Sequence, residues 1–262
     1  MRRTSRDIVT FALGLAVLLG LAFGGYAVVR ARAEGGTPRQ ALAVVDVPSP
    51  ASSAPLAPQY QRWTVGKALG PVVVLARPLP GARVRARLQE RTPQSYPTLV
   101  LVRAVREVAG VTWYRVSIAV RPNGSSGWVR EGQLAFYTTS AKIVIDLSAR
   151  RLAVYRRGEK VGSYPVAVGR PGLETPTGLY FVNQKLRPPS PGGPYGVLAL
   201  GISAFQPALS SWPQGGPVAI HGTNRDDLIG QAVSHGCVRM HDADVLAVSR
   251  SVPAGSPVVI QK

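Results

Sequence analysis

Residues 142–147 read Lys142-Ile143-Val144-Ile145-Asp146-Leu147, a short run of β-branched and aliphatic side chains that predicts a strand. Similar runs follow at 151–156 and 161–168, and the residues Arg156-Arg157-Gly158-Glu159 between them are typical of a hairpin turn. Only the segment 242–248 has a helical pattern, because it opens with acidic residues that suit a first helical turn. This part of the chain is therefore predicted to be mainly β.

A second set of short alternating strands lies upstream, between residues 60 and 137, where Gly and Pro mark the turns. About five strands in fewer than about eighty residues indicate a small barrel or sandwich. The clearest predicted strands are 72–75, 83–88, 99–102, 113–118 and one that begins at Gly127.

The N-terminus has the features of a membrane-targeting segment. Residues 1–7 hold three arginines, and the 22 residues 8–29 contain no charge. As a helix they would span roughly 33 Å, enough for the hydrocarbon core of a bilayer and longer than the apolar region of a usual signal peptide. We expect an uncleaved transmembrane anchor, with cleavage at Ala31-Arg32-Ala33 as the alternative. In both cases the rest of the chain is exported.

Residues 30–59 are predicted to form an extended spacer, because Pro, Ala and Ser dominate their second half. The spacer would hold the two β-rich parts away from the membrane. The chain is thus divided into a basic cytoplasmic flank (1–7), an anchor or signal segment (8–29), a linker (30–59), a β module (60–137) and a second β domain (138–262).

The composition excludes several classes of protein. Of 262 residues, 45% are hydrophobic and 17% are charged, which is not the composition of a disordered chain. The single cysteine excludes an intramolecular disulfide framework and paired-cysteine zinc fingers.

The net charge of +18 is unevenly distributed. Residues 59–137 carry 12 basic and 3 acidic residues, which is half of the excess. We expect no nucleic acid as partner, because the chain has no helix-turn-helix pattern and export would separate it from that ligand. Anionic envelope polymers or lipid head groups are the expected partners of the basic module.

All three histidines and the cysteine fall within one segment of 21 residues that begins at His221. Such clustering of scarce reactive residues indicates a site, and we interpret Cys237 as a nucleophile. Gly236 would allow a tight turn beside the sulfur, so that N–H groups at these two positions could donate to an oxyanion. Arg239 would favour the thiolate. His221 could fold back as the base, with its ring oriented by the carbonyl of Gly222.

Three other interpretations of the cluster remain open. His221, His235, Cys237 and His241 could hold zinc, although no acidic ligand lies at an obvious spacing. A redox-sensing thiol would lack a resolving cysteine. The cysteine could also be simply buried, with the histidines on the surface. We expect no metal and no cofactor, and His241 is interpreted as a capping or packing residue outside the site.

Two motifs resemble the catalytic domain of the L,D-transpeptidases (the YkuD type): His221-Gly222-Thr223-Asn224 and Ser234-His235-Gly236-Cys237-Val238-Arg239-Met240. The resemblance covers residues 138–262 in the right order. Further stretches that match are 143–147, 152–155, 164–169, 175–178 and 193–196. The upstream module resembles the bacterial SH3-like modules of cell-wall proteins, at Trp113-Tyr114-Arg115-Val116 and Gly127-Trp128-Val129.

The resemblance implies a β-sandwich-like catalytic domain in which Cys237 accepts an acyl group from the third residue of a peptidoglycan stem peptide. The terminal D-alanine of a tetrapeptide donor would leave, and a side-chain amine of a neighbouring stem would resolve the thioester. His221 is then the proton donor and acceptor, Gly222 its orienting carbonyl, and His235 has a supporting role. Substrate or oxyanion contacts are expected from Ser234, Gly236, Arg239 (where some members carry Asn) and Tyr195.

The function we expect is therefore peptidoglycan cross-linking between third residues of stem peptides, outside the cytoplasm. An L,D-carboxypeptidase that uses water to resolve the same acyl-enzyme is one alternative. A non-catalytic cell-wall-binding protein is another, although the intact pair His221 and Cys237 opposes it.

Overall fold

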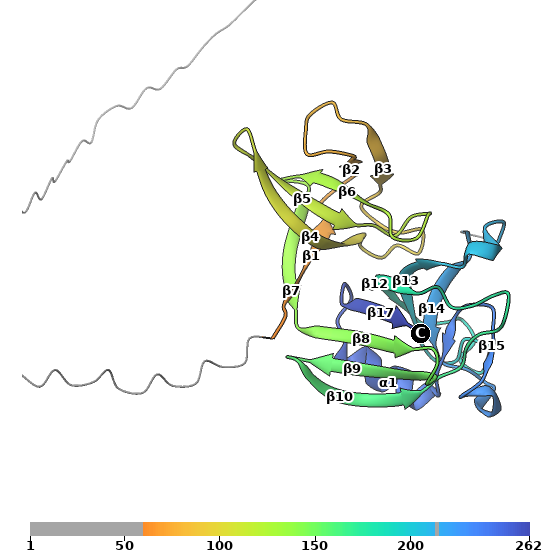
Figure 1. Cartoon of the computed structure of the whole chain (residues 1–262). Helices are drawn as coiled ribbons and strands as arrows, with labels where there is room; N and C mark the ends of the chain where they lie inside the picture. Colours follow the sequence, from red (N-terminus) through yellow and green to blue (C-terminus); the bar gives the residue numbers. More distant parts are fainter. Residues whose placement is uncertain (1–59, 213–214) are drawn as a thin grey trace, which may run out of the picture. The chain divides into compact units, whose positions relative to one another are not determined.

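The computed structural model describes residues 60–212 and 215–262. These described residues belong to one compact unit, which contains two large β-sheets and a separate two-stranded pair (Figure 1). The predicted anchor at 8–29 and most of the predicted linker at 30–59 precede this unit, and both lie outside the described residues. Within the described part of the chain, no helix has the length and apolar character needed to cross a membrane.

The first sheet contains seven strands: β1 (Trp63–Ala68), β2 (Val72–Leu75), β3 (Val84–Leu88), β4 (Leu99–Val108), β5 (Val111–Ser117), β6 (Ser126–Arg130) and β7 (Leu134–Thr139). All five predicted strands are present, and β1 and β7 are additional. Their order is β3-β2-β6-β5-β4-β1-β7, and every pair is antiparallel.

This sheet has its own apolar core, to which Val74, Val100 and Val116 contribute. We expected a small barrel or sandwich, and the described pairings form one sheet with β3 and β7 at its two edges. The reason is that β7 pairs along its whole length with β1 and then continues into the second sheet. The SH3-like character of the module stays a prediction.

The second sheet begins after Ser140, two residues beyond the predicted domain boundary. Its strands are β8 (Ala141–Asp146), β9 (Arg151–Arg156), β10 (Glu159–Pro165), β12 (Gly178–Leu186), β13 (Ala199–Phe205), β14 (Pro217–His221), β16 (Val238–Arg239) and β17 (Pro257–Gln261). Their order is β10-β9-β8-β17-β12-β13-β14-β16, and within this sheet the described strands pair in parallel only at β17–β8 and β14–β16. A separate parallel pair joins β11 (Val168–Gly169) to β15 (Ala232–Ser234).

One apolar core lies inside the second sheet. Leu152 of β9 and Val238 of β16 belong to the same cluster although their strands lie near opposite ends of the strand order. The sheet must therefore curve around a single core, and the domain is mainly β as expected. Val245 and Val248 of α1 (Asp242–Ser251) close that core, and this helix is the one predicted after the cysteine.

The hairpin predicted at residues 156–159 is present between β9 and β10. Arg157 and Gly158 both have positive φ, 50° and 84°, which is the conformation that a two-residue hairpin turn requires. The two sheets also contact each other. Phe181 of β12 is fully buried in a small cluster with Val65 and Leu101 of the first sheet.

Candidate active site

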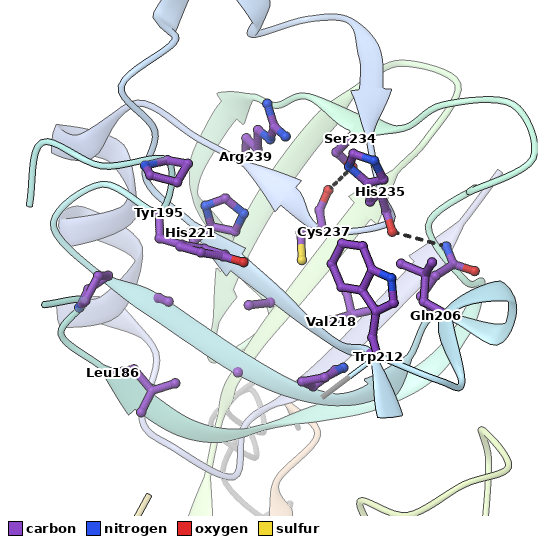
Figure 2. A pocket seen from close by; sticks show the side chains of 18 of the residues that line it. Leu186, Tyr195, Gln206, Trp212, Val218, His221, Ser234, His235, Cys237 and Arg239 are labelled. Atoms are coloured by element: carbon purple, nitrogen blue, oxygen red, sulfur yellow. Dashed lines mark hydrogen bonds between the residues drawn. The ribbon is translucent and has the colours of Figure 1, made fainter. Parts of the chain in front are cut away.

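A pocket of about 990 Å³ opens beside β13, β14 and β16. Six of the eight predicted site residues line it, and Figure 2 shows the Cys237 sulfur between the ring of His221 and the indole of Trp212. The other two, Gly222 and Gly236, lie next to lining residues in the chain. The lining residues among those predicted are Tyr195, His221, Ser234, His235, Cys237 and Arg239.

The two sequence motifs meet because their strands are neighbours. His221 is the last residue of β14, and β14 pairs in parallel with β16, which follows Cys237 directly. In this register His221 lies opposite Arg239 and Ile220 lies opposite Val238. Strand pairing therefore places the upstream histidine and the cysteine at the same edge of the second sheet.

The ring of His221 is held in one orientation. Its Nδ1 lies 2.6 Å from the carbonyl oxygen of Gly222, so Nδ1 carries the proton and Nε2 is left as the acceptor. The side chain is only 2% exposed, and burial lowers its pKa to about 4 because the charged form loses its hydration. The positive charge of Arg239 acts in the same direction, and the bond to Gly222 opposes it. His221 is thus neutral at pH 7.

Tyr195 covers this histidine, with 4.9 Å between the two ring centroids. The loop that carries Tyr195 is tied to the start of α1, because Asp242 Oδ1 accepts a hydrogen bond from the N–H of Val197 (3.2 Å). The same carboxylate packs so closely against Gly222 that a Cβ at that position would collide with it. Asp242 therefore supports the backbone around His221 and Gly222, a role that its position at a helix start did not reveal.

The turn before Cys237 is stabilised by the side chain of Ser234, which is fully buried. Its Oγ donates to the carbonyl of Cys237 (2.6 Å) and accepts from the N–H of Gly236 (3.0 Å). Gly236 has φ +112°, and a Cβ there would lie 2.6 Å from Nε2 of Gln206. The predicted tight turn is confirmed. However, the Gly236 N–H that we assigned to an oxyanion donates to Ser234 instead.

Cys237 is partly buried at the pocket. Burial raises the pKa of its thiol, whereas a backbone hydrogen bond at Ala219 and the positive charge of Arg239 act in the lowering direction. Arg239 Nε is buried without a hydrogen-bond partner in the described structure. The site therefore combines a protonated thiol, a neutral acceptor and a guanidinium that has unused hydrogen-bonding capacity.

His235 lies on the far side of Cys237 from Tyr195 (Figure 2). Its ring is exposed and faces that of Trp212, with 5.8 Å between the centroids. Its carbonyl accepts a long hydrogen bond of 3.5 Å from Nε2 of Gln206, which also donates to the carbonyl of Glu174 (2.9 Å). Trp212 and Gln206 were not predicted, because they lie in an irregular connection that has no motif of its own.

His241 does not join the site. It precedes α1 as the N-cap residue, its Nδ1 lies 2.9 Å from Oδ1 of Asp226, and it does not line the pocket. This agrees with its interpretation as a capping or packing residue. Over residues 60–212 and 215–262, His, Cys, Asp and Glu form no group of three or more that could hold a metal ion.

Comparison with known proteins gives one consistent family. Residues 140–260 match the YkuD family, described as an L,D-transpeptidase catalytic domain. A putative L,D-transpeptidase YkuD of Bacillus licheniformis is 41% identical over 123 residues, which cover 47% of this chain and 67% of that protein. The corresponding protein of Bacillus subtilis is 36% identical over 126 residues, 48% of this chain and 69% of that one. The crystal structure of L,D-transpeptidase 3 from Mycobacterium tuberculosis is 18% identical, with a TM-score of 0.40 over 62% of this chain and 98% of that chain.

Proposed function

We propose that residues of this pocket catalyse the joining of peptidoglycan stem peptides through a thioester on Cys237, because the chain belongs to the family of L,D-transpeptidases. The observation that carries the proposal is the pairing of β14 with β16, which places a buried, neutral His221 and Cys237 in one pocket. Members of this family are enzymes of peptidoglycan cross-linking. The residue roles below are our proposal for this chain.

In the acylation step, Nε2 of His221 accepts the proton of the Cys237 thiol, and the sulfur attacks the carbonyl carbon of the third residue of a tetrapeptide donor. The Cys237 N–H stabilises the resulting oxyanion, with the positive charge of Arg239 nearby. The carbon–nitrogen bond to the terminal D-alanine then breaks. His221 returns the proton to the leaving amine, and a thioester remains on the sulfur.

In the second step, the side-chain amine of a neighbouring stem attacks the thioester carbonyl. His221 accepts a proton from that amine and gives it to the departing sulfur, so that an amide links the two third residues and the thiol is restored. The pocket extends on both sides of Cys237, toward Tyr195 and toward Trp212, which leaves room for two peptide strands (Figure 2).

Arg239 is proposed to bind a carboxylate of the donor peptide. Its Nε lacks a hydrogen-bond partner, and the ion pairs of the described residues are Arg225–Asp227 and His241–Asp226, so no carboxylate among those residues pairs with it. A guanidinium whose buried Nε has no hydrogen-bond partner can still donate to a carboxylate of the substrate, and such a charge-assisted hydrogen bond is strong in a partly buried site.

Incubation of the full-length protein with a disaccharide tetrapeptide tests the proposal, with mass spectrometry of the products. Cross-linked dimers that release D-alanine support the transpeptidase. Tripeptide without dimer would indicate the carboxypeptidase alternative, in which water resolves the thioester. Cys237→Ala and His221→Ala should abolish both products, whereas His241→Ala is a matched control outside the pocket. Turnover by Cys237→Ala would show that the mechanism is wrong.

A second proposal concerns the basic face of the first sheet and an anionic polymer of the cell envelope. Arg106 lies opposite Trp113 on β5, and Trp113 lies opposite Arg130 on β6, so the two arginines share one face of the sheet with Arg115. All three arginines are exposed, and none forms an ion pair in the described structure. Such a face attracts phosphate-bearing polymers.

Binding of the full-length protein to purified cell wall, with and without its teichoic-type polymers, tests this second proposal. We expect salt-sensitive binding that weakens when the three arginines are replaced by glutamine. Equal retention on both walls would contradict it.

We further propose that residues 8–29 anchor the protein in the membrane with its catalytic part outside the cytoplasm. Release of the protein from membranes by salt alone would contradict this.

A further inference from the structure

The turn before β6 reaches from the first sheet onto the wall of the catalytic pocket. Nη2 of Arg121 donates to the carbonyls of Gln206 (2.6 Å) and Gly215 (2.5 Å), and its Nε donates to the same Gly215 carbonyl (2.9 Å). The guanidinium also lies over the ring of Phe205, 5.5 Å from its centroid. Because Gln206 follows β13 and Gly215 precedes β14, Arg121 ties together both ends of the connection between these strands.

Asn123 adds a second tie at the same place. Its Nδ2 donates to the carbonyl of Phe205 (2.7 Å), and its Oδ1 accepts from the N–H of Phe205 (2.8 Å). Its amide thus pairs with the last residue of β13 in the way that a neighbouring strand would. Both hydrogen-bonding groups of that backbone position are satisfied by a side chain of the other sheet.

The connection held in this way is part of the pocket. Its residues Gln206, Leu209 and Trp212 line the wall on the Trp212 side of Cys237. Gln206 is 4% exposed and links Arg121 to the Cys237 turn. Its carbonyl accepts from Arg121, and its Nε2 donates to the carbonyl of His235, two residues before Cys237. Hydrogen bonds therefore run from Arg121 through Gln206 to the turn that presents the sulfur.

The sheets do not depend on these two residues to stay together. Elsewhere in their contact, Tyr137 Oη donates to the carbonyl of Ala254 (2.9 Å), and the hydroxyls of Thr139 and Ser256 lie 3.2 Å apart. The apolar cluster around Phe181 also joins the sheets there. Loss of Arg121 should therefore disturb the pocket wall more than the association of the sheets.

We propose that Arg121 and Asn123 are positioning residues for the reaction. They act from the first sheet on Gln206 and Trp212, and so set the shape of the pocket and the geometry of the Cys237 turn. The effect on turnover rests on the proposed function. The effect on the thiol itself does not, because Cys237 is the only cysteine of the chain and its reactivity can be measured directly.

The test compares Arg121→Ala, Arg121→Lys and Asn123→Ala in the full-length protein with two controls. Tyr137→Phe removes an inter-sheet hydrogen bond away from the pocket, and Arg62→Ala removes an exposed arginine that donates a hydrogen bond to Thr138. The readouts are kcat and KM for the tetrapeptide donor, and the rate of Cys237 alkylation by iodoacetamide across pH.

We expect kcat/KM to fall about tenfold or more in Arg121→Ala and Asn123→Ala, with a shifted pH profile of alkylation. Arg121→Lys should recover part of the loss, because an ammonium can reach one carbonyl but lacks the fork that binds two. Both controls should stay within about twofold of the wild-type protein.

The inference is overturned if alkylation and kcat/KM in both alanine variants match the controls. If Arg121→Ala does not fold, Asn123→Ala decides by the same criteria. Turnover that persists in Cys237→Ala would count against the proposed function alone, and the alkylation profiles would still decide this inference.

Discussion

Nδ1 of His221 lies 2.6 Å from the carbonyl oxygen of the next residue, Gly222. This contact fixes which nitrogen holds the proton, and the burial of the ring keeps it neutral. A base of this kind is ready to accept a proton from a thiol without first losing one to solvent. The pH behaviour of the enzyme follows from it.

The first prediction concerns how kcat/KM falls on the acidic side of its pH profile. Because the pKa of His221 is lowered to about 4, the acceptor should stay competent far below the usual histidine range. We expect kcat/KM for the tetrapeptide donor to show no histidine titration between about pH 5 and pH 7. An acid limb centred near pH 6.5 that persists in His235→Ala and His241→Ala would contradict the assignment.

The lowered pKa of His221 also predicts how the free energy of unfolding depends on pH. The folded pKa is below the unfolded value, so the unfolded chain binds more protons between about pH 6.5 and pH 4, and stability falls as pH falls through that range. For this buried group the loss should reach about 3 kcal/mol. Urea unfolding at several pH values measures it. His221→Gln should lack this part of the slope, and an unchanged slope would refute the expectation.

Removal of the ring that covers the base should move its pKa. Tyr195→Ala exposes His221 to water, so its pKa should rise toward the ordinary value of about 6.5. Tyr195→Phe keeps the ring and is the matched control. NMR titration of the three imidazoles shows the change directly. If both variants titrate alike, burial by Tyr195 is not what holds the pKa down.

Gly236→Ala should lower the stability of the protein for two reasons that can be tested separately. The positive φ of +112° strains any other residue, by about 1–3 kcal/mol, and the new Cβ would meet Nε2 of Gln206. Gly230→Ala is the control, because Gly230 has φ +86° but open space around it. We expect a larger loss of thermal stability at Gly236, with part of it recovered in the double variant with Gln206→Ala. No recovery would mean that the collision is unimportant.

The sequence predicted those parts of the fold that are locally encoded. Residues 151–156 form a strand with the predicted bounds, because apolar side chains alternate there and a hairpin turn follows. Strand β13 was not singled out, since Ala199–Phe205 is buried on both faces and shows no alternation. The contact of Arg121 with Gly215 joins residues 94 positions apart, and nothing local marks such a pair.

The site was predicted more completely than the fold around it. His221 and Cys237 lie in one pocket because their strands pair, and the Gly222 carbonyl contacts the His221 ring as expected, whereas their catalytic roles stay predictions. Asp242 and Gln206 were missed, because their roles depend on which backbone groups the fold brings next to them. The hydrogen bond from the Gly236 N–H to Ser234 was missed for a similar reason, and the oxyanion role expected of Gly236 stays a prediction.

The most direct test of the central claim is the intact mass of the protein after mixing with the tetrapeptide donor, followed by mapping of the modified peptide. We predict a mass increase equal to the donor minus D-alanine, located on Cys237, absent in Cys237→Ala and formed slowly in His221→Gln. An adduct on another residue, or its formation in Cys237→Ala, would contradict the account.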